Sequence, residues 1–263
     1  MISSRLVLGA LLALAGCATQ SAELALTPAA ATRIGQRLWQ NECGGSVAGL
    51  TSWNAGEDFP SLGIGHFIWY PEGRTGPFQE SFPSMIAFLR QRGAEPPAWV
   101  VSTPHCPWPT RAAFQAEING PRLTSLRAFL KNTVGLQTEF AAARAKAALG
   151  TLLAAAPAGE RAGLAAKYDA VGTSPQGVYA LVDYVNFKGE GTNPSERYQG
   201  QGWGLLQVLQ EMRPVGSGPG AAAEFSAAAK RVLDRRISVA PRPEGQWRAG
   251  WFNRCDSYGR AFR

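Results

Sequence analysis

The stretch NECGGSVAGLTSWNAGEDFPSLGIGHF, residues 41–67, decides the fold because the hydrophobic pattern changes period within it. Before it, apolar residues recur at helical spacing. From residue 49 onward within it, short apolar runs alternate with turns rich in glycine, asparagine and aspartate, which is typical of small strands. The chain therefore passes from a helix into a small sheet, and one carboxylate, Glu42, lies at the junction.

The helix before this junction has clear ends in the sequence. Thr27-Pro28 supplies a capping hydroxyl and a first-turn proline, and Gly44-Gly45 is a typical helix end. Ile34, Leu38 and Glu42 share one face. Partial desolvation and the negative end of the helix dipole would both favour the protonated form of Glu42, which suits a proton donor. The alternative is a solvated glutamate at a helix end.

Residues 49–70 predict a hairpin or small sheet, with a turn at Asn54–Asp58. Gly63 and Gly65 leave one surface of this sheet without side chains. A ligand could approach that surface closely, or the glycines could belong to the edge of a bulged hairpin. The sequence leaves both interpretations open.

The rest of the chain is mainly helical. We expect a short helix near Phe82–Arg90 and an irregular, proline-rich connection carrying Trp99 and Trp108, whose indoles could stack on sugars or be buried. A long helix with one possible break follows. The predicted helices beyond Gly120 are Pro121–Leu153, Pro175–Phe187, Gln201–Met212, Ala221–Ile237 and Gln246–Ser257.

The segment 186–210 is a glycine-rich loop that concentrates polar and aromatic residues after an apolar helix. Loops of this kind on a helical scaffold often form one wall of a binding site. We therefore take Asn186, Lys188, Glu190 and Tyr198 as candidates for substrate binding. The alternative is a long turn between helices with solvated charges.

The first residues have the layout of an export signal. Residues 1–16 hold one arginine and an apolar run too short to span a bilayer comfortably. Leu14-Ala15-Gly16-Cys17 resembles a bacterial lipobox, which implies lipidation of Cys17, a tether over residues 17–26 and an outer-membrane position facing the periplasm. An ordinary signal peptide with a chance cysteine is the alternative.

Composition narrows the class of protein. The chain has 263 residues, 45% hydrophobic and 17% charged, with a net charge of +7, so it can bury a core and attract anionic polymers or headgroups. Dispersed basic residues and export argue against nucleic acid. Cys43, Cys106 and Cys255 allow at most one disulfide within the mature chain, and no pair is singled out. The Cys and His spacing offers no zinc site, and we expect no metal or cofactor.

Two regions together resemble phage-type lysozyme, a muramidase of the lysozyme-like superfamily. The first is a helix ending in Glu42, followed by a hairpin that closes on Ser61-Leu62-Gly63-Ile64-Gly65-His66. The second is ALVDYVNFKGE, residues 180–190, with LLQVLQ, residues 205–210. Together these regions cover about a quarter of the chain. Residues 71–120 have no counterpart in the family.

The resemblance implies an α+β fold over residues 27–263, with a hairpin subdomain at about 45–70, a helical lobe at about 120–260 and a glycan cleft between them. By position, Glu42 matches the general acid and Ser61 the hydroxyl that helps to hold the attacking water. The second acid departs from the family pattern in spacing. Asp58 and Glu57 are the candidates for it, with Asp58 preferred.

These expectations make the chain a monomeric, lipid-anchored peptidoglycan hydrolase that cleaves β-1,4 glycosidic bonds. His66 is expected to brace the hairpin by hydrogen bonding and to border the substrate. A lytic transglycosylase that relies on one acid is an alternative, as is a wall-binding lipoprotein without catalysis. A hydrolase of a related amino-sugar polymer such as chitosan is the third, although the positive net charge disfavours a cationic substrate.

Overall fold

The helix predicted to end after Glu42 is present as α1 (Pro28–Cys43) in the computed structural model, which describes residues 26–76, 78–194 and 196–262. The Thr27 hydroxyl accepts a hydrogen bond from the Ala30 amide at 3.2 Å, and Gly44 ends the helix at a φ of 60°. Ile34 and Leu38 are fully buried. The apolar face and both ends of this helix are confirmed.

The segment after α1 forms a three-stranded antiparallel sheet, which confirms the predicted change of period. Its strands are β1 (Thr51–Ser52), β2 (Ser61–Leu62) and β3 (Phe67–Ile68), in that order. Thr51 pairs with Leu62, and Leu62 with Phe67. This register holds the loop 63–66 just beyond the end of α1.

Helices make up most of the remaining described residues, so the chain is mixed, mostly helical and compatible with the predicted α+β class. The first group is α2 (Phe82–Gln91), α3 (Ala98–Ser102), α4 (Arg111–Ala116), α5 (Pro121–Asn132) and α6 (Val134–Ala155). The second is α7 (Arg161–Gly172), α8 (Pro175–Lys188), α9 (Leu205–Glu211), α10 (Pro219–Val239) and α11 (Arg248–Asp256). A two-stranded ribbon, β4 (Arg197–Tyr198) and β5 (Gln201–Gly202), precedes α9, and the 3₁₀ turns are Ala48–Leu50, Gly245–Trp247 and Ser257–Gly259.

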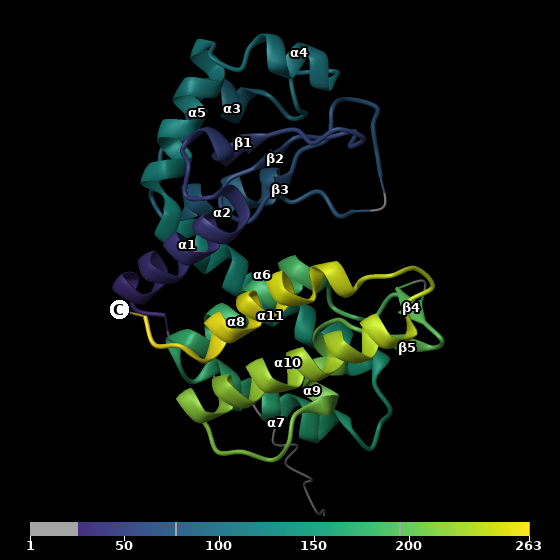
Figure 1. Cartoon of the computed structure of the whole chain (residues 1–263). Coiled ribbons are helices and arrows are strands. Elements are labelled where there is room, and N and C mark those ends of the chain that lie inside the picture. The colour runs from purple at the N-terminus through teal and green to yellow at the C-terminus, as the bar shows by residue number, and fades with distance from the viewer. Residues whose placement is uncertain (1–25, 77, 195, 263) are drawn as a thin grey trace, which may run out of the picture.

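Figure 1 shows these elements in two layers. The first, here called the sheet lobe, holds β1–β3 with α2–α5. The second, here called the helical lobe, holds α7–α11 with the β4–β5 ribbon. The helices α1 and α6 run between the lobes and pack against each other. The end of α1 therefore lies where the two lobes meet.

A buried amide ties the loop after β2 to the start of α6. Gln137, fully buried, accepts a hydrogen bond from the Ile64 amide at 3.1 Å and donates one to the Leu130 carbonyl at 2.6 Å. Thr133 separates α5 from α6, so the predicted break in the long helix is real. The loop that carries the Gly-x-Gly-His sequence is thus fixed to the interlobe helix.

Several sequence expectations need correction or completion. The helices α3, α4 and α7 were missed, so the connection predicted to be irregular contains the short helix α3 around Trp99. The helix predicted from Gln201 begins only at Leu205 because residues 201–202 pair as strand β5. Trp108 is buried, and the Trp99 indole donates to the Ser125 hydroxyl at 3.1 Å within an aromatic cluster. Neither tryptophan is a surface platform, so burial was the correct one of the two alternatives.

Candidate functional site

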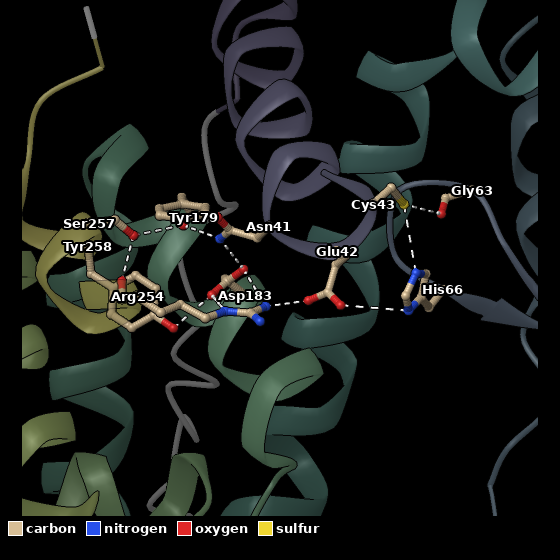
Figure 2. A network of polar contacts seen from close by, with 10 residues as sticks. All are labelled: Asn41, Glu42, Cys43, Gly63, His66, Tyr179, Asp183, Arg254, Ser257 and Tyr258. Carbon is tan, nitrogen blue, oxygen red and sulfur yellow. Dashed lines mark hydrogen bonds and ion pairs between the residues drawn. The ribbon is translucent and has the colours of Figure 1, made fainter. Parts of the chain in front are cut away.

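Glu42 lies between the two lobes with a charged partner on one side and an imidazole on the other. Its side chain is only 15% exposed. It forms an ion pair with Arg254 of α11, and its Oε2 lies 3.7 Å from Nδ1 of His66. Figure 2 shows the carboxylate between these two groups. The sequence prediction of a partly desolvated carboxylate at the end of α1 is confirmed.

Arg254 is shared between Glu42 and the fully buried Asp183 of α8. Its Nε and Nη2 donate to the Asp183 carboxylate at 2.7 and 2.9 Å, a bidentate pair. Burial alone would lower the pKa of Arg254, but the negative charges of Asp183 and Glu42 raise it overall. The guanidinium is therefore a fixed positive charge that orients Glu42 from the helical lobe.

Asp183 accepts two further hydrogen bonds, so its carboxylate is satisfied within the protein. Tyr258 donates to it at 2.7 Å and the Asn41 amide at 3.1 Å. The same Asn41 amide donates to the Tyr179 hydroxyl at 2.7 Å. Asn41 comes from α1, next to Glu42, so the network joins α1, α8 and α11 behind the candidate acid (Figure 2).

The side chain of His66 lies at the end of α1, with its ring close to both Cys43 and Glu42. Its backbone is in the left-handed region, with φ at 49°, and its ring reaches back across the lobe junction. The ring Nε2 lies 3.7 Å from the Cys43 sulfur, and Nδ1 faces Glu42. Burial, with a contribution from the charge of Glu42, raises the pKa of the Cys43 thiol to about 12. Cys43 is thus a neutral neighbour and no thiolate nucleophile.

A groove of about 300 Å³ is lined by residues of both lobes and of α6, and neither Glu42 nor His66 is among its lining residues. Phe67 and Gln79 line it from the sheet lobe, and α6 supplies a floor of alanines. Phe67 follows His66 in the chain, and the lining residue Val182 precedes Asp183. The small side chains leave room for a ligand in the groove. The remaining lining residues are Ala141, Arg144, Ala145, Ala147, Ala148, Thr151, Val185, Asn186 and Glu190.

The structure divides the four substrate-binding candidates of the 186–210 loop into two pairs. Asn186 and Glu190 line the groove. Partial burial raises the pKa of Glu190, and the positive charge of Arg144 opposes that shift. Lys188 and Tyr198 line a different cluster, so the loop does not act as one continuous wall.

That cluster is a stack of cations and aromatic rings. The Lys188 ammonium lies 3.5 Å from the centre of the Trp251 ring and 4.1 Å from that of Phe187. Burial and the nearby charge of Arg236 lower the pKa of Lys188 to about 7. Tyr198 donates to Glu244 at 3.1 Å, and Glu244 is paired with Arg236. Phe187 also contacts Arg254, which connects the stack to the Glu42 network.

The two candidates for the second acid have partners of their own in the sheet lobe. Asp58 is 74% exposed, and its Oδ1 is 3.9 Å from Nη1 of Arg74. Glu57 accepts a hydrogen bond from the Asn54 amide at 3.2 Å. Over the described part of the chain, neither makes a hydrogen bond or ion pair with the Glu42 network. Ser61 is buried in β2, opposite Ile68 of β3.

Sequence reasoning missed three members of the network. Asp183 carried one signal, an acidic residue at a position surrounded by apolar residues in a predicted helix. Asn41 precedes the candidate acid but has no distinctive spacing. Arg254 is 212 residues from Glu42 along the chain, and its segment shows no motif that points to this pairing.

The predictions for residues 1–16, Cys17 and the tether lie outside the described residues, Leu26 excepted. Among the helices of the described part, none is long and apolar enough to cross a membrane. All three cysteines of the described residues, Cys43, Cys106 and Cys255, are free thiols.

Comparison with known proteins gives no relative: no protein-family model matches the chain, and neither a curated protein nor a solved structure is significantly similar to it. The function therefore has to be argued from the geometry of the site.

Proposed function

We propose that the chain is a lysozyme-like glycoside hydrolase that cleaves β-1,4 bonds of peptidoglycan, with Glu42 as the general acid. One observation carries the proposal: a largely buried glutamate ends a helix where the two lobes meet, in a fold that also has a groove lined by both lobes. A glycosidase needs such a carboxyl group next to an elongated space for the glycan. Asn186 and Glu190 supply polar contacts along that space.

Glu42 and Asp183 both contact the guanidinium group of Arg254. Asp183 accepts four hydrogen bonds, two of them from Arg254 in a bidentate pair. Glu42 meets the same guanidinium from its other side. Two carboxyl groups thus share one cation, and Glu42 is the one that we propose as the general acid. Arg254 holds this carboxyl toward the glycosidic oxygen.

In the hydrolytic route, a second carboxylate activates water on the opposite face of the sugar. Asp58, or Glu57 beside it, takes this role on the turn of the sheet lobe, and Ser61 helps to position the water. An inverting reaction requires the two carboxyl groups to stand roughly 6.5 to 9.5 Å apart when substrate is bound. His66, next to Glu42, borders the sugar at the point of cleavage.

The exposure of Asp58 also favours a second candidate, a lytic transglycosylase. In that route a single acid protonates the leaving oxygen, and a hydroxyl group of the sugar itself attacks, which leaves an anhydro end. Asp58 is 74% exposed and pairs with Arg74 on the surface of the sheet lobe, whereas Glu42 has the partners expected of an acid that works alone.

The decisive test compares the mature chain with its Glu42→Gln variant on purified peptidoglycan, with mass spectrometry of the released fragments. Glu42→Gln keeps the shape of the side chain and removes the proton donor, so we expect soluble fragments to disappear, a loss of at least ~100-fold in rate. Glu72→Gln, an exposed acid of the sheet lobe, is the matched control and should release fragments normally.

The fragments also discriminate between the routes. Reducing ends together with inactivity of Asp58→Asn or Glu57→Gln indicate hydrolysis. Anhydro ends with both of those variants active indicate transglycosylation. Full activity of the Glu42→Gln variant would contradict both the hydrolytic route and the transglycosylase route.

Two other functions remain as outcomes of the same experiment. Binding of peptidoglycan without fragments from the wild-type chain would indicate a wall-binding protein. Fragments from chitosan and none from peptidoglycan would indicate a related amino-sugar hydrolase. In every case we propose that lipidated Cys17 anchors the chain to the outer membrane, facing the periplasm, which mass measurement of the chain purified from membranes would test.

A further inference from the structure

A second hollow lies on the far side of α1 from Glu42. It has a volume of about 800 Å³ and is formed by the exposed face of α1 and the last residues of the chain. Figure 1 shows the C-terminal segment passing beside the beginning of α1. The lining residues are Arg33, Gln36, Arg37, Gln40, Arg260, Ala261 and Phe262. The proposed glycosidase does not use this hollow.

The lining is positively charged and contains no acidic residue. Arg33 and Arg37 are four residues apart on α1, so their like charges lie side by side, and Arg260 joins them from the C-terminal segment. Within the described residues, none of the three guanidinium groups forms an ion pair. By contrast, Arg236 and Arg254 each pair with a carboxylate of the fold.

Such a cluster is suited to an anion from outside the chain. A guanidinium presents a planar fork of donors that matches the oxygens of a phosphate group, and three forks around one hollow can share one phosphate. The amides of Gln36 and Gln40 add neutral donors at the same rim. The charge and the donors together indicate a phosphate-bearing ligand.

The hollow lies close to the proposed lipid anchor, which favours a membrane lipid as the molecule that carries the phosphate. At most about 40 Å of extended chain separates Cys17 from Pro28, the first residue of α1. A lipid on Cys17 would therefore keep α1 near the membrane surface, where anionic headgroups attract basic side chains. The face of α1 with Arg33 and Arg37 is exposed, while the face with Glu42 turns to the lobe junction.

We propose that the hollow lined by Arg33, Arg37 and Arg260 binds the phosphate of an anionic phospholipid headgroup and docks the back of α1 on the membrane that holds the anchor. Docking in this way turns the face of α1 that carries Glu42 away from the membrane. The inference rests on the proposed anchorage at Cys17 and is independent of the chemistry at Glu42.

The test measures co-sedimentation of the mature chain, residues 17–263 with Cys17→Ser to prevent acylation, with lipid vesicles. One set contains phosphatidylethanolamine and phosphatidylglycerol at 3:1, and the other contains phosphatidylcholine alone. We expect binding to the anionic vesicles only. The triple variant Arg33→Gln, Arg37→Gln and Arg260→Gln should bind about 100-fold more weakly, because each basic residue near an anionic surface adds about fivefold.

The matched control removes the same charge elsewhere, through Arg90→Gln, Arg122→Gln and Arg242→Gln, all on exposed residues. Equal loss in both triple variants, or equal binding to both vesicle types, would overturn the proposal. So would binding of inorganic phosphate strong enough to compete with the vesicles at constant ionic strength, since the site would then serve a free anion. Far-UV circular dichroism checks that each variant is folded.

Peptidoglycan cleavage by the first triple variant separates this inference from the proposed function. Because none of the three arginines borders the groove, soluble glycan fragments should be released at the wild-type rate. A variant that loses vesicle binding and keeps cleavage supports both ideas. Inactivity of Glu42→Gln or of the wild type would leave the vesicle result unchanged.

Discussion

At the scale of single residues, the candidate site depends on one arginine that serves two carboxylates. Asp183 is fully buried and needs a positive partner, and the largely buried Glu42 carboxylate contacts the same partner. The planar guanidinium group of Arg254 serves both carboxylates, because it can pair with Asp183 and bind Glu42 at the same time. Stability and proposed catalysis are therefore coupled through a single side chain.

Replacing this arginine should be costly to the fold. Arg254→Met leaves the Asp183 charge buried without a cation, which we expect to lower the free energy of unfolding by about 3 to 5 kcal/mol in urea titrations. The control Arg248→Met breaks a solvent-exposed pair with Asp234 and should cost far less. Equal costs for the two variants would mean that Arg254 has no special role in stability.

The Lys188 ammonium gives the fold a pH dependence of its own. Burial, with the charge of Arg236, lowers the pKa of Lys188 from 10.5 to about 7, although Glu244 opposes the shift. Below pH 7 the group is charged in the folded and unfolded chains alike, and the destabilising effect of its burial is complete. Between pH 7 and 10.5 only the unfolded chain holds the proton, so stability recovers as pH rises.

Lys188→Met should therefore raise the melting temperature most below pH 7, with the gain shrinking steadily between pH 7 and 10. The measurement is thermal unfolding at intervals of one pH unit. Lys131→Met, on an exposed helical lysine, is the control and should show no such trend. A gain that is constant with pH, or one that grows toward pH 10, would contradict the lowered pKa.

At the scale of elements, local signals in the sequence were sufficient for α1 and the small sheet. The cap at Thr27, the apolar spacing and Gly44 fix α1 without help from distant residues. The helix α7 was missed because Arg161–Gly172 is rich in alanine and glycine, and its apolar stripe is weak. The ribbon β4–β5 has two residues per strand, too few for a period of two to be visible.

The loop between β2 and β3 depends on a contact that no local signal reveals. Gly63 has a φ of 72°, and a Cβ atom there would lie 2.4 Å from the Gln137 side-chain oxygen. Gly63→Ala therefore strains the backbone and disturbs the hydrogen bond from the Ile64 amide. We expect a loss of about 2 to 4 kcal/mol in the free energy of unfolding.

Gly73 offers a closely matched control because it has the same φ of 72° with open space around the position of a Cβ atom. Gly73→Ala should lose only the backbone contribution, about 1 to 2 kcal/mol. The difference between the two variants measures the contact with Gln137. If both lose the same amount in urea titrations, the buried amide does not hold the loop.

At the scale of the whole molecule, the sequence singled out Glu42 as a candidate site residue but not its partner Arg254. Glu42 could be predicted because its helix and the following hairpin are local structures. Arg254 could not, since its pairing with Glu42 depends on how α11 packs against α8 and α10, far along the chain. The groove is a further property of assembly, because its lining comes from both lobes and from α6.

The groove makes a prediction that concerns glycan binding alone. Ala148 lines it from α6 and is half-buried, so Ala148→Trp would place an indole in a space of about 300 Å³. We expect affinity for soluble peptidoglycan oligomers to fall at least ~10-fold in isothermal titration, because the occupied space excludes a sugar ring. Ala143→Trp, on an exposed residue of α6 outside the groove, should bind normally.

The comparison with Glu42→Gln then separates binding from chemistry. Glu42→Gln should keep its affinity for the oligomers and release no product, whereas Ala148→Trp should lose affinity and still cleave at saturating substrate. An Ala148→Trp chain that binds the oligomers as the wild type does would show that the glycan lies elsewhere on the molecule. The groove between the lobes would then be only a gap in the packing, and Glu42 would need another route to its substrate.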